Sequence, residues 1–257
     1  VGAGITGARV VRELSVSPEV SRVAVVSKRP ARVKELETAL GAVVGAHRPG
    51  EPVDVVILAG PVGDHGRLAR EWLEAGASVV SLSPDPTDVT ALLALDAVAR
   101  AAGRFVACGA GLAPGLSTLL VQWAARRFDR VDEVHVAVSG NGGRACAEWE
   151  RSSVRGEVDE WRDGAWQRVP SGGGELVWFP DPVGAQLADV ASSADPALIV
   201  RRWPDLKRVV VRSARSSRSL SDRLLPGRRA TTNDDVGAVR VEVRGVVGSA
   251  TDTVVVG

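Results

Sequence analysis

Short apolar runs alternate with amphipathic segments through the first half of the chain. Four runs have the length and the largely apolar character of buried parallel strands: residues 23–26, 53–58, 77–82 and 104–107. The segments between them carry apolar residues at helical spacing, and they predict helices from Pro30, around residues 68–73, over 87–102 and around 116–124. Strands separated by helices predict an α/β fold with a doubly wound parallel sheet of the Rossmann type.

The periodicity changes near Val131. Three valines, at 134, 136 and 138, alternate with Glu133, His135 and Ala137, which is typical of a strand with one buried face. Asp163-Gly164, between two tryptophans, is typical of a tight hairpin turn. Further strands are predicted at 206–212, 236–247 and 252–256, and a polar helix at 215–224. The second half is therefore predicted to be an α+β domain with a largely antiparallel sheet, so that the domains are residues 1–129 and 130–257.

Composition and charge restrict the classes of binding partner that are expected. The 257 residues include 32 basic and 31 acidic side chains, a net charge of +1, which argues against a polyanionic partner such as a nucleic acid. Cys108, Cys146 and three histidines form no zinc-type spacing, so no metal is expected and a cytoplasmic location is the default expectation. No apolar run approaches the roughly 18 to 20 residues of a membrane span, so no membrane partner is expected.

The most specific motif opens the chain. It has glycines at GxGxxG spacing in the run Gly2, Ala3, Gly4, Ile5, Thr6 and Gly7. Apolar residues then recur at helical spacing through Val10, Val11 and Leu14, so a helix is expected to begin at these glycines. Such a turn lets the backbone approach a pyrophosphate at a helix N-terminus. Only Val1 is present of the strand expected before it, so that strand is expected to be truncated.

The tip of the next predicted strand distinguishes the two nicotinamide cofactors. An acidic side chain there binds the ribose hydroxyls of NAD, whereas arginine and hydroxyl groups accommodate the 2′-phosphate of NADP. The residues present are Ser27, Lys28 and Arg29, with no acid between Ser21 and Val33. The sequence therefore predicts NADP(H) as cofactor, and the alternative interpretation is a solvated basic turn on a fold that binds nothing.

Loops rich in glycine and proline follow the other predicted parallel strands. They are Ala59-Gly60-Pro61, Ser81-Leu82-Ser83-Pro84 and the segment 108–115. Ligands of open parallel sheets bind at the carboxyl ends of the strands, so these loops are expected around one crevice, with Ala59, Gly60 and Pro61 on the cofactor. Taken singly, each loop is equally well explained as an ordinary turn.

These features together resemble the saccharopine-dehydrogenase-type NADP-binding proteins. The resemblance rests on the glycine turn, the Ser-Lys-Arg tip, the segment Gly109-Ala-Gly-Leu-Ala-Pro-Gly-Leu-Ser117 and Trp178-Phe-Pro-Asp-Pro182. That group is close in architecture to glucose-fructose oxidoreductase. The resemblance implies a Rossmann domain with an α/β domain, and hydride transfer between NADPH and a small carbonyl or imine substrate, often an amino or keto acid. It also implies a closing helix that returns to the Rossmann domain, which this sequence does not contain.

The proton donor is not identified by any motif. Glucose-fructose-type enzymes carry a lysine after the fifth strand, where this chain has Ser81 to Pro84, and a chain without tyrosine cannot use the Tyr-Lys pair of short-chain dehydrogenases. His135 and Asp181 are the candidate catalytic residues, although a packing histidine and a turn residue explain them equally. Cys146 is a third candidate, against the commoner inert thiol.

The missing lysine also supports a second hypothesis, a non-catalytic NADP(H) sensor or assembly protein. A third hypothesis, a nucleic-acid binder using the basic stretch Arg201–Arg229, competes with a solvated surface in which one or two arginines hold a substrate carboxylate. Fold analogy further suggests a homodimer through the sheet domain.

Overall fold

The computed structural model describes residues 1–140, 143–214 and 236–257. These residues form two compact units, one comprising Val1–Gly111 with Gly142–Cys146 and the other comprising Leu112–Asn141 with Ala147–Gly257. We call them the parallel-sheet unit and the antiparallel-sheet unit. The predicted boundary at 129/130 stays a prediction. The contacts group residues 116–125 with the second unit because Val121 and Ala124 are buried in the same cluster as Val134 and Val136.

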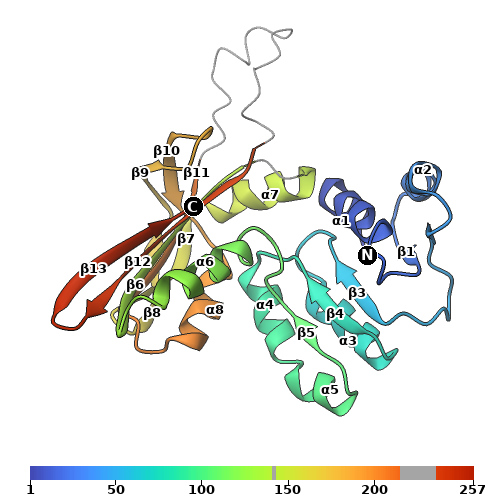
Figure 1. The fold of residues 1–257 in the computed structure, drawn as a ribbon, viewed down its shortest axis with the longest axis horizontal. Coiled ribbons are helices and arrows are strands. Elements are labelled where there is room, and N and C mark those ends of the chain that lie inside the picture. Colours follow the sequence, from blue (N-terminus) through green and yellow to red (C-terminus); the bar gives the residue numbers. More distant parts are fainter. Residues whose placement is uncertain (141–142, 215–235) are drawn as a thin grey trace, which may run out of the picture. The chain divides into compact units, whose positions relative to one another are not determined.

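The parallel-sheet unit alternates short strands and helices as predicted (Figure 1). The elements are α1 (Ile5–Ser15), β1 (Val23–Val25), α2 (Pro30–Leu40), β2 (Val44–Ala46), β3 (Val55–Leu58), α3 (His65–Glu74), β4 (Ser78–Ser81), α4 (Pro86–Leu93), α5 (Asp96–Ala101) and β5 (Val106–Ala107). The single helix predicted over 87–102 is wrong, because the helix ends at Leu93 and α5 begins at Asp96.

Val1 and Gly2 lie between two parallel strand groups, β1–β2 and β3–β4–β5. The amine of Val1 donates to the carbonyl of Ile57, the amide of Ala59 donates to the carbonyl of Val1, and the amide of Gly2 donates to the carbonyl of Val26. Figure 1 shows the N-terminus between β1 and β3. With Val1 counted as the first strand, the order is 3-2-1-4-5-6, which is the Rossmann order. The predicted fold class is confirmed for this unit.

The antiparallel-sheet unit is built on an eight-stranded sheet with a main path β13-β12-β6-β11-β10-β9, to which β7 and β8 attach beside β11. Its elements are α6 (Leu116–Ala125), β6 (Arg130–Ser139), β7 (Glu157–Arg162), β8 (Ala165–Pro170), β9 (Gly172–Trp178), β10 (Ala185–Val190), α8 (Asp195–Arg202), β11 (Arg208–Ala214), β12 (Ala238–Val247) and β13 (Ala250–Val256). Only the β6–β11 pair is parallel. The helix α7 (Arg144–Ser153), which the sequence analysis did not predict, precedes β7.

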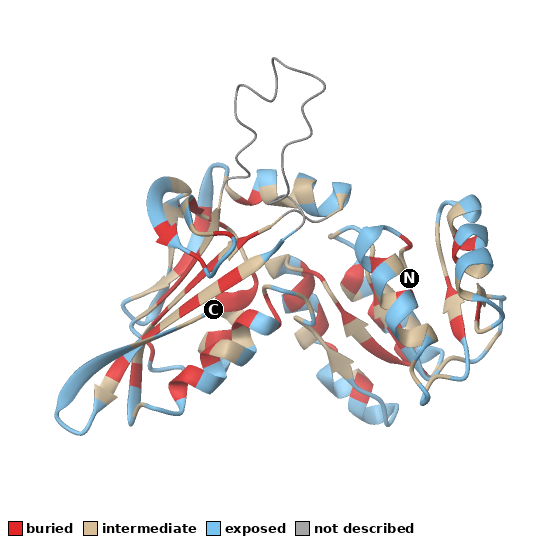
Figure 2. Ribbon diagram, turned by 45° about the horizontal axis from the view of Figure 1, so that its top comes forward, coloured by how far each residue is buried: buried red, intermediate tan, exposed pale blue. Residues whose placement is uncertain are grey.

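One face of this sheet carries the core of its unit. Val134 and Val136 on β6 pack with Val209 and Val211 on β11 and with three valines of β12, and α6 and α8 cover this face. Figure 2 shows the buried residues along these strands. The hairpin predicted at Asp163-Gly164 is confirmed: both residues have positive φ, and Trp161 on β7 pairs with Trp166 on β8. The polar helix predicted at 215–224 lies outside the described residues.

Candidate functional site

The three glycines of the opening turn have different surroundings. Gly2 has φ +100°, and a Cβ there would lie 2.7 Å from the carbonyl carbon of Ala59, while a Cβ on Gly7 would lie 2.0 Å from the carbonyl oxygen of Gly2. A Cβ on Gly4, in contrast, would meet no atom within 4 Å. Two of the glycines therefore permit close backbone packing, and the third leaves open space above the turn. This is the division of roles that a dinucleotide turn requires.

The turn leads directly into the N-terminus of α1. Gly4 is the N-cap, and no described side chain accepts a hydrogen bond from the first turn of this helix. Gly4, Ile5 and Thr6 are exposed, whereas Ala3 and Gly7 are buried. The first N–H groups of a helix have no partner within the helix and carry the positive end of its dipole. The turn therefore fits the pyrophosphate of a dinucleotide.

The basic tip of β1 leads into α2. The hydroxyl oxygen of Ser27 accepts a hydrogen bond from the amide of Arg29 at 3.1 Å, so the tip has a defined local turn. Lys28 and Arg29 are exposed. Arg29 is the N-cap of α2, and Pro30 occupies the first helical position, which favours helix initiation there.

Arg32 is the residue at this site that the sequence analysis missed. Its Nε donates to the carbonyl of Ala3 at 3.4 Å, and its Nη1 pairs with Glu35 at 2.6 Å. The first turn of α2 therefore lies against the glycine turn. Arg29 is the N-cap of α2 and Arg32 lies three residues later, in the first turn of the helix. This spacing is the signal that could have identified Arg32.

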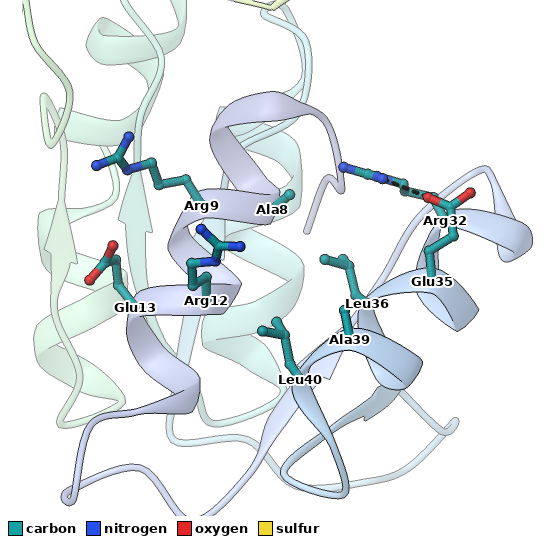
Figure 3. A pocket seen from close by; sticks show the side chains of 9 residues that line it. All are labelled: Ala8, Arg9, Arg12, Glu13, Arg32, Glu35, Leu36, Ala39 and Leu40. Atoms are coloured by element: carbon teal, nitrogen blue, oxygen red, sulfur yellow. Dashed lines mark hydrogen bonds and ion pairs between the residues drawn. The ribbon is translucent and has the colours of Figure 1, made fainter.

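A groove of about 460 Å³ runs between α1 and α2 (Figure 3). Leu36 and Leu40 point from α2 toward α1, and three arginines, Arg9, Arg12 and Arg32, are among the residues that line the groove. Residues of the two helices, and not the Ser27–Arg29 tip, line it. Its link to the glycine turn is Arg32.

The loop after β3 contacts the glycine turn on its other side. The carbonyl of Ala59 and the nitrogen of Gly60 occupy the space that a Cβ on Gly2 would need. Ala59 and Gly60 are half-buried and Pro61 is exposed. The crevice between the first strand and β3 is where the strand order reverses, and ligands of such sheets bind at that point.

A buried polar network holds this loop. The Nε2 of His65 lies 3.4 Å from the carbonyl of Gly60, and its Nδ1 lies 2.8 Å from the hydroxyl of Ser81 at the end of β4. Because a carbonyl only accepts, the proton lies on Nε2 and Ser81 donates to Nδ1. Asp88 accepts from the amides of Gly63 and His65. His65 is 1% exposed, so it positions the loop and does not reach a ligand itself.

Ser81 and Ser83, in the segment where the sequence analysis noted the absence of a lysine, are also buried. Their exposed fractions are 0% and 2%. The hydroxyl of Ser83 donates to Asp88 at 2.7 Å. Both hydroxyls therefore belong to the network that supports the loop, and neither replaces the missing proton donor.

The two catalytic candidates belong to different elements of the antiparallel-sheet unit. His135 is on β6, and its Nε2 pairs with Glu133 at 3.0 Å. Burial lowers the pKa of His135, and the carboxylate of Glu133 acts in the opposite direction. Asp181 is exposed in the turn between β9 and β10, where the amide of Val183 donates to the carbonyl of Pro180. The structure does not bring these two side chains together, and their catalytic roles stay predictions.

The basic stretch is only partly described. Arg201 and Arg202 end α8, and Arg208 and Arg212 lie on β11. Residues 215–229 lie outside the described residues. Cys146 is exposed on α7 and Cys108 is half-buried. Among the described residues, no group of three or more histidine, cysteine or acidic side chains could hold a metal ion.

A buried carboxylate also escaped the sequence analysis. Asp195 at the start of α8 is 0% exposed, and it accepts hydrogen bonds from the hydroxyls of Ser117 on α6 and of Ser193. Burial raises the pKa of Asp195, and the two hydroxyl donors oppose that shift. Asp195 therefore joins α6 to α8 within the core.

Comparison with known proteins identifies the fold. No model of a protein family matches the chain, and no curated protein matches it. Among solved structures, saccharopine dehydrogenase (L-Glu forming) from Saccharomyces cerevisiae matches with a TM-score of 0.59 at 18% identity, over 82% of this chain and 53% of that one. The chain thus spans about half the length of the yeast enzyme.

Two further structures match over nearly the whole chain. A putative myo-inositol dehydrogenase from Sinorhizobium meliloti 1021 has a TM-score of 0.53 at 16% identity, over 98% of this chain and 73% of that one. GenD2 from gentamicin A biosynthesis, whose structure is a complex with NAD, has a TM-score of 0.51 at 17% identity, over 99% and 70%. The predicted resemblance is confirmed at the level of the fold, which the chain shares with these three structures.

No helix among the described residues is long and apolar enough to cross a membrane.

Proposed function

We propose that the chain is an NADP-dependent oxidoreductase that transfers a hydride between NADPH and a small carbonyl or imine substrate of the amino or keto acid type. The observation that carries this proposal is the division of roles among Gly2, Gly4 and Gly7 at the point where the strand order reverses. The fold is shared with a saccharopine dehydrogenase, with a putative myo-inositol dehydrogenase and with GenD2, whose structure is a complex with NAD.

The chain's own groups would hold the cofactor in three places. The N–H groups at the start of α1 would bind the pyrophosphate, and the loop Ala59-Gly60-Pro61 would line the opposite wall. Ser27, Lys28 and Arg29, with Arg32 beside them, would bind the 2′-phosphate. Guanidinium groups form bidentate hydrogen bonds to phosphate, whereas no acidic side chain occupies this tip to bind a free ribose hydroxyl. When bound, NADPH supplies the hydride.

The antiparallel-sheet unit would present the substrate. Asp181 and His135 are the candidates for the proton that accompanies hydride transfer. A homodimer through this unit, a cytoplasmic location and the domain boundary at 129/130 are part of the same proposal.

One observation favours a second function, a non-catalytic NADP(H) sensor or assembly protein. The position at which related enzymes place a lysine holds Ser81 and Ser83, and both are engaged in the buried network with His65 and Asp88. A site that binds cofactor but has no proton donor at this position is suited to report the cofactor's redox state.

Calorimetric titration with NADPH and with NADH tests cofactor binding. We expect NADPH to bind more tightly than NADH. The substitution Arg29→Asp should reduce the ratio of the NADH to the NADPH dissociation constant at least tenfold, and it should leave the NADH dissociation constant within a factor of about three. The matched control is Arg104→Asp, which makes the same charge change at an exposed residue before the amino end of β5. Absence of binding by either cofactor would contradict both functions.

Turnover separates the two functions. Purified protein is incubated with NADPH and a panel of keto acids, semialdehydes and keto acid–amine mixtures, and cofactor oxidation is followed by absorbance. Oxidation with any member supports the oxidoreductase. Binding of NADPH without oxidation across the panel supports the sensor.

A further inference from the structure

A pocket of about 220 Å³ lies on the face of the antiparallel sheet opposite α6 and α8. We call it the sheet-face pocket, and the residues that line it are His135, Val136, Ala137, Glu175, Val177, Arg208, Arg212, Arg240, Glu242 and Arg244. All of them belong to the antiparallel-sheet unit. Neither the glycine turn nor the groove between α1 and α2 contributes to it.

Strand register creates this charged face. Glu133 on β6 lies between Arg208 on β11 and Arg244 on β12, and four residues further along the strand Ala137 lies between Arg212 and Arg240. Residues directly opposite on neighbouring strands share a face of the sheet. Val134 and Val136 point to the other face, into the core. The pocket therefore lies on the opposite face of the same strands from the apolar core.

Two arginines of the pocket flank Ala137. In the strand register Ala137 lies between Arg212 and Arg240, on strands that lie about 5 Å to either side of β6. Ala137 itself is buried and packs with Val177 and Phe179. Both arginines line the pocket beside this small apolar cluster, and side chains of this length, starting about 10 Å apart, are within reach of one anion in the pocket.

Three carboxylates on this face each pair with two basic side chains. Glu242 pairs with both Arg240 and Arg244, and Glu160 pairs with both Arg162 and Arg208. Glu133 pairs with His135 and Arg244. Each guanidinium has five N–H donors and each carboxylate about four acceptor sites, so arginines that share their carboxylates with other basic side chains keep N–H donors for a further acceptor.

Arg212 shows the imbalance most clearly. Its side chain is 12% exposed, and burial lowers the pKa of its guanidinium, so its charge is poorly solvated. Among the described residues Arg212 forms an ion pair with Glu175 at 2.6 Å, and the side chain of Glu175 is 60% exposed on the edge strand β9. Glu175 can move into water at little cost, whereas Arg212 cannot. A ligand anion could therefore take the place of Glu175.

We propose that the sheet-face pocket binds a compact oxyanion, a carboxylate or a phosphate group, between Arg212 and Arg240, with Glu175 as the group it displaces. The volume restricts the ligand to a small molecule, because pockets for larger organic ligands are roughly 300 to 1,000 Å³. Guanidinium pairs recognise these two planar or tetrahedral oxyanions by bidentate hydrogen bonds. This inference does not depend on the cofactor proposal, because every group it uses lies in the other unit.

The test is calorimetric titration of the full chain with glutarate and, separately, with inorganic phosphate, both at constant ionic strength set by chloride. We expect one of the two to bind saturably in the millimolar range, and the arm that binds identifies the anion. Arg212→Met and Arg240→Met should each weaken binding at least tenfold. The control Arg168→Met removes an exposed arginine of β8 in the same unit and should change nothing.

The variant Glu175→Gln gives a test that a folding defect cannot imitate, because the expected result is tighter binding. It removes the competing carboxylate without removing a ligand, so anion affinity should rise about three- to tenfold. Unchanged or weaker binding in this variant would overturn the proposal. So would absence of saturation with both anions, or equal binding by Arg212→Met and Arg168→Met.

Histidine resonances give a second measurement. His135 faces Glu133 on its own strand, Arg208 and Arg212 on β11, Arg240, Glu242 and Arg244 on β12, and Glu175 on β9. A bound anion adds negative charge beside it and should raise its apparent pKa in proton NMR titrations, with His135→Asn assigning the signal among three histidines. No change on saturation with anion would place the binding elsewhere and overturn the assignment. The variant Arg29→Asp should leave both measurements unaffected.

Discussion

The two units use their sheets differently. In the parallel-sheet unit the strands are three or four residues of nearly continuous apolar sequence, except for two-residue β5, and the polar groups lie in the turns at their ends. In the antiparallel-sheet unit the strands are longer and alternate, with valines on one face and arginines and glutamates on the other. The first arrangement allows chemistry only where strands end, whereas the second offers a whole face.

This difference determines which of the two sites can be predicted from the sequence. The glycine turn is predictable because its three residues lie within six positions and act locally. The sheet-face pocket is not, because it depends on β6, β11 and β12 being adjacent and in a particular register. Arg212 and Ala137 are neighbours only through that register, and no local pattern specifies it.

The largest expected effect is on the glycine turn itself. In Gly7→Ala the new Cβ would lie 2.0 Å from the carbonyl oxygen of Gly2, and backbone cannot move away cheaply. We expect a loss of unfolding free energy on the order of 3 kcal/mol or more, measured by urea denaturation. Gly4→Ala is the matched control, because nothing lies within 4 Å of its Cβ, and its loss should stay under about 1 kcal/mol. Equal losses in both variants would show that the two glycines are not distinguished by packing.

The buried carboxylate of the antiparallel-sheet unit predicts a pH effect. The pKa of Asp195 is raised from 3.8 by burial, so the folded state holds its proton more tightly than the unfolded state does. The stabilisation is complete below the ordinary pKa and is lost as pH rises through the raised value. Relative to Asp195→Asn, the wild-type chain should therefore lose unfolding free energy as the pH rises from about 4 toward neutrality. Parallel pH profiles for the two proteins, in urea titrations, would contradict the role assigned to Asp195.

The β7–β8 hairpin predicts the smallest effect. Gly164 has φ +76°, where a side chain costs about 1 to 2 kcal/mol, so Gly164→Ala should lower the unfolding free energy by that amount. Asp163 has φ +54°, which asparagine adopts equally well, so Asp163→Asn should stay within about 0.5 kcal/mol. Thermal denaturation of the two variants measures the contrast, and a larger effect of Asp163→Asn would show that the carboxylate has a role beyond the turn.

Much of the fold could be predicted from pattern. The alternation of apolar runs and helical spacings located β1, α2, β3, α3 and β4, and the Asp-Gly pair located the hairpin. The break between α4 and α5 was missed because neither Pro nor Gly marks it: Leu92, Leu95 and Ala99 continue the apolar spacing across Ala94-Leu95. The predicted strands at the end of the chain were correct in kind, whereas α7, β9, β10 and α8 had no prediction because their apolar residues are few or irregularly spaced.

The residues of the candidate site also fall into two groups, those that a local sequence pattern identifies and those that it does not. Gly2, Gly4 and Gly7 and the Ser27–Arg29 tip were found from local spacing, and the contact of Gly2 with Ala59 followed from the Rossmann order. Arg32 was missed because its contact with Ala3 depends on how α2 packs against the turn. Asp195 was missed because its partner Ser117 is 78 residues away. Long-range polar contacts leave no pattern along the chain.

The central claim is that the open space above Gly4 holds the cofactor's pyrophosphate. The most direct test is calorimetric titration of NADPH into the wild-type chain and into Gly4→Val, with urea denaturation run beside it. The account predicts that Gly4→Val stays folded and loses at least tenfold in NADPH affinity, because its side chain fills space that only the ligand would use. A folded Gly4→Val variant that binds NADPH as tightly as the wild type would contradict it.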